Sequence, residues 1–468
     1  MNVLKTTIWK NSPPYKGGNF LYLFLNFLRY TPLRMNRDRF PLLRRLTLLS
    51  FCFLSFLHAQ SDPQPEQTVL TEKTKIVIVN KIGNVLAENY LFPEIAEKIK
   101  KHLLIQLNNN VYAHITFPQQ FAKALSRDLQ QVSDDRHLQV YYAPHRIKLL
   151  SSQEETVEAQ RQRRERDRFI NYGFQKIERL AGNVGYLELQ EFAKERLGYE
   201  TAVSTMNFLS NSDALIIDLR KNRGGSPRMV QLIGSYLFDE EPVHLFTHYY
   251  RDEKSTQEFW TLDYLPGKRL ANIPVYILTS KETFSAAEEF AYALQVLKRA
   301  TVVGEQTGGG SNLGHWEYIN RDFYMFVPRG RIEQPLTGTN WEGVGITPDI
   351  ETPAEKALDF AHAKALQILL KDNPDSLFDD QRRWALSGLK AKMNPLRIDP
   401  ASANGFAGKY GSSMISFQND TLRYRRPEGD FFKMIPMGND VFMLEETNFF
   451  RLHFSRNPRG EIDKLIKI

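Results

Sequence analysis

The chain has 468 residues, 42% of them hydrophobic and 12% aromatic, which is enough apolar material for more than one core. Its formal net charge is +7, but residues 1–59 alone carry +8, so the remainder of the chain carries −1. A near-neutral body gives no basis for a surface that attracts phosphates, and we expect no nucleic-acid partner.

The N-terminal region has the pattern of a secretory signal peptide. From Met35 the sequence reads MNRDRFPLLRRLTLLSFCFLSFLHAQ, a basic segment followed by a short apolar run that ends near Ala59. We therefore assign residues 1–59 to a signal-peptide region, expect the true start at Met35, and place the mature protein in the periplasm or outside the cell. An uncleaved anchor is the alternative, but the run is short for a membrane span.

The single cysteine, Cys52, lies inside that apolar run. Cleavage would leave a mature chain with no thiol, which excludes disulfides, cysteine metal ligands and a cysteine nucleophile.

After a polar linker, apolar residues recur at helical spacing and predict an N-terminal helical domain over 68–135. The segment 136–353 begins with a strand at HLQVYY and includes a charged stretch, 151–168, which we interpret as a solvated helix or linker. The interval between residues 137 and 184 is too short to hold an inserted peptide-binding (PDZ) domain.

From residue 184 onward, short apolar runs alternate with helical patterns, which indicates an α/β core. The predicted strands are VGYLEL, ALIIDLR, VYILT, ATVVGE and FYMFVPRG, with helices near 199–209, 227–238 and 285–297. A helical connector is expected over 354–395, and a small β domain over 401–468.

Ser285 stands out in VYILTSKETFSAAEEFAYAL, at the point where a strand and turn lead into a helix. A hydroxyl at a helix N-terminus lies in a positive field, and the backbone N–H of Ala286 has no partner within the helix. Such a group can stabilise a developing oxyanion. The alternative is that Ser285 only caps the helix, as serine often does.

Three further segments contain polar or glycine-rich turns after apolar runs. In ALIIDLRKNRGGSPRMV, Gly224 and Gly225 would let the main chain approach a ligand closely. VVGEQTGGGSNLG is a second glycine-rich loop, but it lacks the Gly-Lys-Ser/Thr ending of a phosphate-binding loop. NWEGVGITPDIE presents Glu342 in a turn-rich segment.

In combination, DLRxNxGG, TSxxTFSAAEEFA, GExTGGG and WEGVGITPDI resemble the tail-specific, or C-terminal-processing, serine peptidase superfamily. The resemblance covers about residues 75–370 and is strongest to the branch with the tricorn core protease and interphotoreceptor retinoid-binding protein. It implies an α/β fold with a ClpP/crotonase-like ββα spiral core.

The resemblance also implies roles for individual residues. Ser285 matches the nucleophile, His137 in DDRHLQV the base, and Glu342 the acidic partner. The N–H of Ala286 and that of Gly224 or Gly225 match the oxyanion hole. Processing proteases with a lysine base carry it where this chain has Gly310, so a Ser–Lys dyad is excluded.

We therefore expect a secreted serine peptidase that hydrolyses peptides or unfolded proteins through an acyl-enzyme. We expect no cofactor and no metal, since no His, Asp, Glu or Cys pair has ligand spacing such as HExxH. The alternative is a non-catalytic binding protein for apolar ligands, because retinoid-binding members of the superfamily carry such ligands on this fold.

Overall fold

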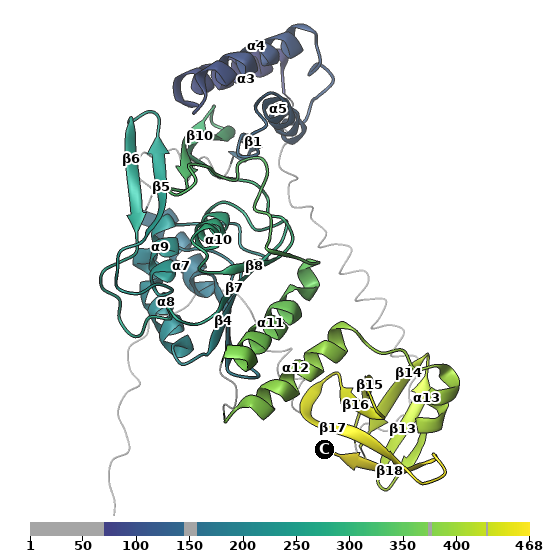
Figure 1. Ribbon diagram of the computed structural model, residues 1–468. Helices are drawn as coiled ribbons and strands as arrows, with labels where there is room; N and C mark the ends of the chain where they lie inside the picture. Colours follow the sequence, from purple (N-terminus) through teal and green to yellow (C-terminus); the bar gives the residue numbers. More distant parts are fainter. Residues whose placement is uncertain (1–69, 145–156, 373–376, 427–428) are drawn as a thin grey trace, which may run out of the picture. The chain divides into compact units, whose positions relative to one another are not determined.

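The computed structural model describes residues 70–144, 157–372, 377–426 and 429–468 (Figure 1). The proposed signal region 1–59 lies outside the described residues. Among the helices of the described ranges, none is both long enough and apolar enough to cross a membrane.

A six-stranded sheet forms the centre of the predicted α/β core. Its strand order is β11 (Ile350–Glu351), β8 (Thr301–Gly304), β7 (Val275–Thr279), β4 (Ala214–Asp218), β3 (Val184–Leu189) and β2 (Phe174–Leu180). Neighbouring strands are parallel except for β2, which pairs antiparallel with β3. Parallel strands direct their carboxyl ends to one edge, where α/β folds commonly place ligands.

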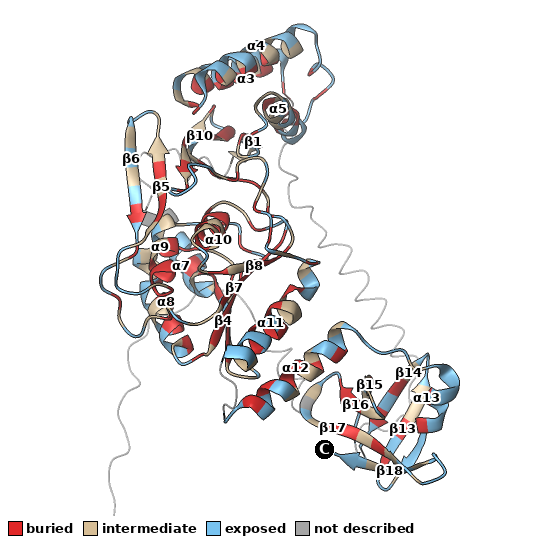
Figure 2. Ribbon diagram, in the orientation of Figure 1, coloured by how far each residue is buried: buried red, intermediate tan, exposed pale blue. Residues whose placement is uncertain are grey.

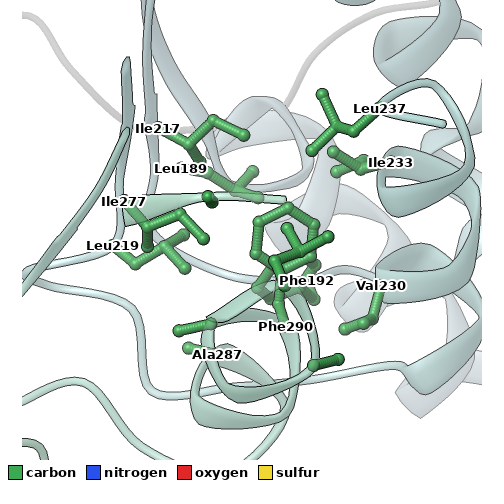
Figure 3. Packing of buried hydrophobic residues seen from close by; sticks show 14 of the residues in the cluster. Leu189, Phe192, Ile217, Leu219, Val230, Ile233, Leu237, Ile277, Ala287 and Phe290 are labelled. Carbon is green, nitrogen blue, oxygen red and sulfur yellow. The ribbon is translucent and has the colours of Figure 1, made fainter. Parts of the chain in front are cut away.

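Both faces of the central strands of this sheet are buried, as Figure 2 shows for β4 and β7. Because side chains alternate along a strand, Leu215 and Ile217 of β4 enter one core while Ala214 and Ile216 enter another. The first core is closed by α8 (Glu195–Leu209), α9 (Pro227–Ser235) and α10 (Ala286–Val296), and Figure 3 shows its packing around Phe290.

The second core is closed by α11 (Ala357–Asp372) and α12 (Asp379–Met393), which follow a short 3-10 turn, η2 (Ala354–Lys356). The charged stretch predicted as a solvated helix or linker is helical where it is described, in α7 (Val157–Phe169), and its described side chains are mostly exposed. A second 3-10 turn, η1 (Asn171–Gly173), leads from α7 into β2.

A second sheet has the order β1 (Gln139–Tyr142), β10 (Phe323–Glu333), β5 (His244–Tyr250) and β6 (Ser255–Trp260), and β9 (Asn312–Tyr318) also pairs with β10. The sequence analysis did not identify the β5–β6 hairpin or β9. Partial exposure and mixed polarity weaken their alternation, as the burial of β6 illustrates.

The N-terminal helices are α3 (Glu72–Asn89), α4 (Pro93–Asn108) and α5 (Pro118–Ser133). Proline at the first position of α4 and of α5, and Thr71 as the N-cap of α3, mark their starts. Their apolar faces share one core with β1 and β10, so the helical segment does not bury its apolar surface alone. Asp134 ends α5 in the left-handed conformation and turns the chain towards β1.

The C-terminal part is a small β domain, as predicted. After α13 (Pro400–Phe406), seven strands form an antiparallel meander with its own core. They are β12 (Gly408–Tyr410), β13 (Ser413–Gln418), β14 (Thr421–Arg425), β15 (Phe431–Gly438), β16 (Val441–Leu444), β17 (Thr447–Arg456) and β18 (Ile462–Lys467). Asn419 and Asp420 both have positive φ angles, as the tight turn between β13 and β14 requires.

The predicted fold class, an α/β core with an N-terminal helical region and a small C-terminal β domain, is therefore confirmed. The division into segments at 135, 353 and 395 stays a prediction.

Candidate active site

Ser285 lies between β7 and α10, where it occupies a strained backbone conformation. Its φ is 55° and its ψ is −126°, a combination that residues with a side chain rarely adopt. The Ser285 N–H donates a hydrogen bond of 2.9 Å to the carboxylate of Glu288, one turn into the helix. The Ser285 side chain is partly accessible, so this sharp turn presents a hydroxyl at the carboxyl edge of the sheet.

Glu288 stabilises the turn at Ser285 through several hydrogen bonds. Its buried carboxylate also accepts hydrogen bonds from the Thr307 hydroxyl, from Gly309 N–H at 2.7 Å and from Gly310 N–H at 2.8 Å. Burial raises the pKa of the Glu288 carboxyl, while these donors oppose the rise. One side chain thus ties the serine turn to the glycine-rich loop after β8.

The loop after β4 passes directly against Ser285. At Gly224, whose φ is 103°, a Cβ atom would lie 2.8 Å from Ser285 Cβ and 2.9 Å from the nitrogen of Ala286. The N–H of Gly224 is already occupied, because it donates to Asn222 Oδ1 at 2.8 Å. Within the described residues, the N–H groups of Gly225 and Ala286 donate to no protein acceptor.

His137 precedes β1, and its ring lies against aromatic rings from the core. The ring centroids of His137 and Phe284 are 4.9 Å apart, and those of His137 and Phe326 are 5.7 Å apart. Phe284 is the residue immediately before Ser285, so β1 brings the predicted base into the neighbourhood of the predicted nucleophile. The His137 side chain is only 9% exposed.

Two carboxylates flank the same nitrogen of that imidazole. His137 Nδ1 lies 3.5 Å from Asp135 Oδ1 and 3.8 Å from Glu342 Oε1. Burial lowers the pKa of His137, but the attraction of the Asp135 and Glu342 carboxylates beside Nδ1 raises it more, with a net result of about 9. The structure therefore brings Glu342 to His137 and adds a second acid.

Asp135 was not identified from the sequence, although it stands two residues before the histidine in DDRHLQV. Its Oδ1 accepts the backbone N–H of His137 at 2.9 Å, and its Oδ2 accepts from the Tyr90 hydroxyl at 3.1 Å and from Asn312 Nδ2 at 3.0 Å. An aspartate that bonds the backbone two residues later is a local turn pattern that the sequence could have suggested.

Glu342 is held by the other side of the site. Its Oε2 accepts the backbone N–H groups of Ser311 at 2.5 Å and Asn312 at 2.9 Å, at the start of β9. Its Oε1 is buried and has no hydrogen-bond partner in the described part of the chain. Glu342 thus has one oxygen fixed by neighbours and one directed at the imidazole, whereas Asp135 Oδ1 both faces the ring and accepts the His137 backbone N–H.

Gly310, the position at which the resemblance would place a lysine base, has no room for a side chain. A Cβ atom there would lie 2.2 Å from the Phe284 ring. Arg136, the neighbour of the histidine, reaches the same loop and donates to the Gly308 carbonyl at 2.7 Å. The absence of a lysine at residue 310 therefore has a packing reason as well.

A strained serine turn at the edge of a parallel sheet, with an imidazole and carboxylates nearby, is an arrangement that serine-type peptidases use. A model of peptidase family S41 matches residues 183–352, and a model of the N-terminal domain of Peptidase_S41 in eukaryotic IRBP matches residues 66–175. Together they span more than half of the chain. The chain belongs to peptidase family S41, which confirms the resemblance in the sequence.

Curated relatives include a carboxyl-terminal-processing peptidase 2, chloroplastic, from Arabidopsis thaliana, 29% identical over 172 residues, which are 36% of this chain and 32% of that protein. A carboxyl-terminal-processing protease from Picosynechococcus is 27% identical over 214 residues, 43% of this chain and 49% of that protein. The chain thus spans between about a third and a half of the length of these relatives.

Among solved structures, a putative peptidase from Parabacteroides merdae is 18% identical with a TM-score of 0.45, covering 66% of this chain and 99% of that one. The tricorn protease is 11% identical with a TM-score of 0.40, covering 64% of this chain and 37% of that one.

Proposed function

We propose that this protein is a secreted serine peptidase that cleaves peptides or unfolded proteins through an acyl-enzyme at Ser285. The observation that supports this best is the imidazole of His137, held by two carboxylates and packed against the residue before a strained, accessible serine.

In the proposed reaction, His137 Nε2 takes the proton of the Ser285 hydroxyl as its oxygen attacks the scissile carbonyl carbon. The imidazolium then gives that proton to the leaving amine. Water hydrolyses the acyl-enzyme with His137 again as the base. Glu342 and Asp135 act on Nδ1, where they fix the tautomer and stabilise the charged ring.

We assign the oxyanion hole to the N–H groups of Ala286 and Gly225. Gly224 N–H is less suitable because it is bonded to Asn222, so the role of Gly224 is to allow the close approach of its loop to Ser285. Each oxyanion donor of this kind contributes about 3 kcal/mol of transition-state stabilisation.

The test is cleavage of casein and of a peptide library by the purified mature chain. We expect cleavage by the wild type and none by Ser285→Ala, with His102→Gln, a histidine of the helical segment outside the site, as a matched control that retains activity. If wild type and Ser285→Ala are equally inactive on every substrate, the proposal fails and the apolar-ligand binding protein becomes the better interpretation.

Secretion is part of the proposal and is tested separately. The chain expressed from Met35 in a Gram-negative host should appear in the periplasm with a new N-terminus after Ala59 or Gln60. Retention of the uncleaved segment in the membrane would favour the anchor instead.

A further inference from the structure

Three side chains at the turn before β1 present ligand atoms to one common point. We propose that Asp135, His137 and Glu342 form a binding site for a zinc ion, and that bound zinc inhibits the enzyme. The binding follows from the geometry alone, whereas the inhibition rests on the proposed function of His137. This ion is an inhibitor and takes no part in the reaction.

The spacing of the three atoms fits a tetrahedral ion. One ligand atom from each residue lies within 4.8 Å of the others, and His137 Nδ1 is 3.5 Å and 3.8 Å from the two carboxylate oxygens. Two ligands bound tetrahedrally to zinc at about 2.0–2.2 Å lie roughly 3.3–3.6 Å apart. Shifts of a few tenths of an ångström would therefore bring each carboxylate oxygen to this spacing from His137 Nδ1.

Two of the three atoms are buried without a hydrogen-bond partner. Among the described residues, neither His137 Nδ1 nor Glu342 Oε1 makes a hydrogen bond. The His137 side chain is only 9% exposed. Unpaired buried polar atoms are costly, and a cation at the point they face would satisfy both.

The surrounding contacts resemble the outer shell of a metal site. Tyr90 and Asn312 donate to Asp135 Oδ2, and two backbone N–H groups donate to Glu342 Oε2, so the oxygens directed at Nδ1 are oriented before any ion arrives. Loss of one such outer contact commonly weakens metal affinity on the order of 10- to 100-fold.

The donor set selects the kind of ion. One imidazole nitrogen with two carboxylates suits zinc, with water in the fourth position. Magnesium and calcium prefer oxygen ligands in larger numbers. No ligand spacing is visible in the sequence, because Glu342 comes from a segment distant from Asp135 and His137 in the chain.

Zinc at Nδ1 would prevent base catalysis for a simple reason. A neutral imidazole has one nitrogen with a lone pair and one with a proton. When the Nδ1 lone pair binds zinc, the proton resides on Nε2, which then cannot accept the proton of Ser285. Zinc and catalysis thus require opposite tautomers of His137.

The binding test uses Ser285→Ala, which keeps all three ligands. Zinc is titrated into the chelator-treated protein and followed by calorimetry. We expect one site, with affinity at least 10-fold weaker in the double variants that add His137→Gln or Glu342→Gln. Adding His102→Gln instead should leave the affinity unchanged, because His102 lies 3.9 Å from Asp128, outside the proposed site. Magnesium should not bind.

Unchanged zinc affinity in the folded His137→Gln and Glu342→Gln variants, or no binding at all, would overturn the site. In the wild type, stoichiometric zinc should reduce peptide cleavage at least 10-fold, and a chelator should restore it. Binding without inhibition would overturn the inhibitory role. Binding to a chain that cleaves nothing even without zinc would contradict the proposed function while leaving the site intact.

Discussion

The replacement Glu342→Gln should move the pH dependence of catalysis, because it removes one of the two charges next to the base. The pKa of His137 is about 9 in the wild type, and the base is active only when neutral. We therefore expect kcat/KM of the wild type to rise with pH and to reach half of its maximum near pH 9. Since kcat/KM reports the free enzyme, this midpoint is the pKa of His137.

The size of the shift follows from the distance. Unit charges 3.8 Å apart interact by about 1 kcal/mol in bulk water and about 4 kcal/mol at an effective dielectric constant of 20. Removal of the Glu342 charge should therefore lower the pKa of His137 by about one to three units. Because the Glu342 side chain is 18% exposed, a shift between these limits is expected.

The assay is hydrolysis of a fluorogenic peptide from pH 5 to 10 with a chelator present. In Glu342→Gln the midpoint should fall while the plateau also falls, because the imidazolium loses a stabilising charge. Glu282→Gln, an exposed acid on the same serine loop, is the control and should keep the wild-type midpoint. An unchanged midpoint in an active, folded Glu342→Gln would refute the reasoning.

Three other predictions concern the same region. Gly310→Ala should destabilise the protein by about 1–3 kcal/mol in urea unfolding, since its methyl group would displace the Phe284 ring, and it should also lower kcat; normal stability would mean that the loop has room to move. Glu288→Ala should release the serine turn and reduce cleavage much more than binding of a substrate peptide, which kcat and KM measured separately would show. The raised pKa of His137 stabilises the fold below pH 6.5, and this contribution, on the order of 3 kcal/mol, should be lost as the pH rises to 9. His137→Gln should lack that dependence in denaturant titrations at several pH values.

The sequence predicted the central sheet because its strands are continuous apolar runs with clear helical segments between them. It missed β5, β6 and β9 because these strands lie in a partly exposed sheet where alternation is weak. The serine turn was visible from the residues alone, but its strained φ and ψ were not, since they depend on contacts with Glu288 and with the loop that contains Gly224.

In the candidate site, too, some features could be predicted from the sequence and others required the structure. His137 and Glu342 could be named only through the resemblance to a family, because nothing local connects two residues so far apart in the chain. The choice between Gly224 and Gly225 required knowledge of the Asn222 hydrogen bond. Asp135 was overlooked because an acid before a histidine is common, and only burial shows that its carboxylate lies beside the ring.

The central claim is that His137 activates Ser285, and covalent labelling tests it most directly. A fluorophosphonate probe is incubated with the wild type, Ser285→Ala and His137→Gln, and the modified peptide is located by mass spectrometry. We predict a single adduct on Ser285 in the wild type, none in Ser285→Ala, and labelling slowed about 100-fold or more in His137→Gln. Labelling of Ser285 at the wild-type rate in folded His137→Gln would show that the imidazole is not its base.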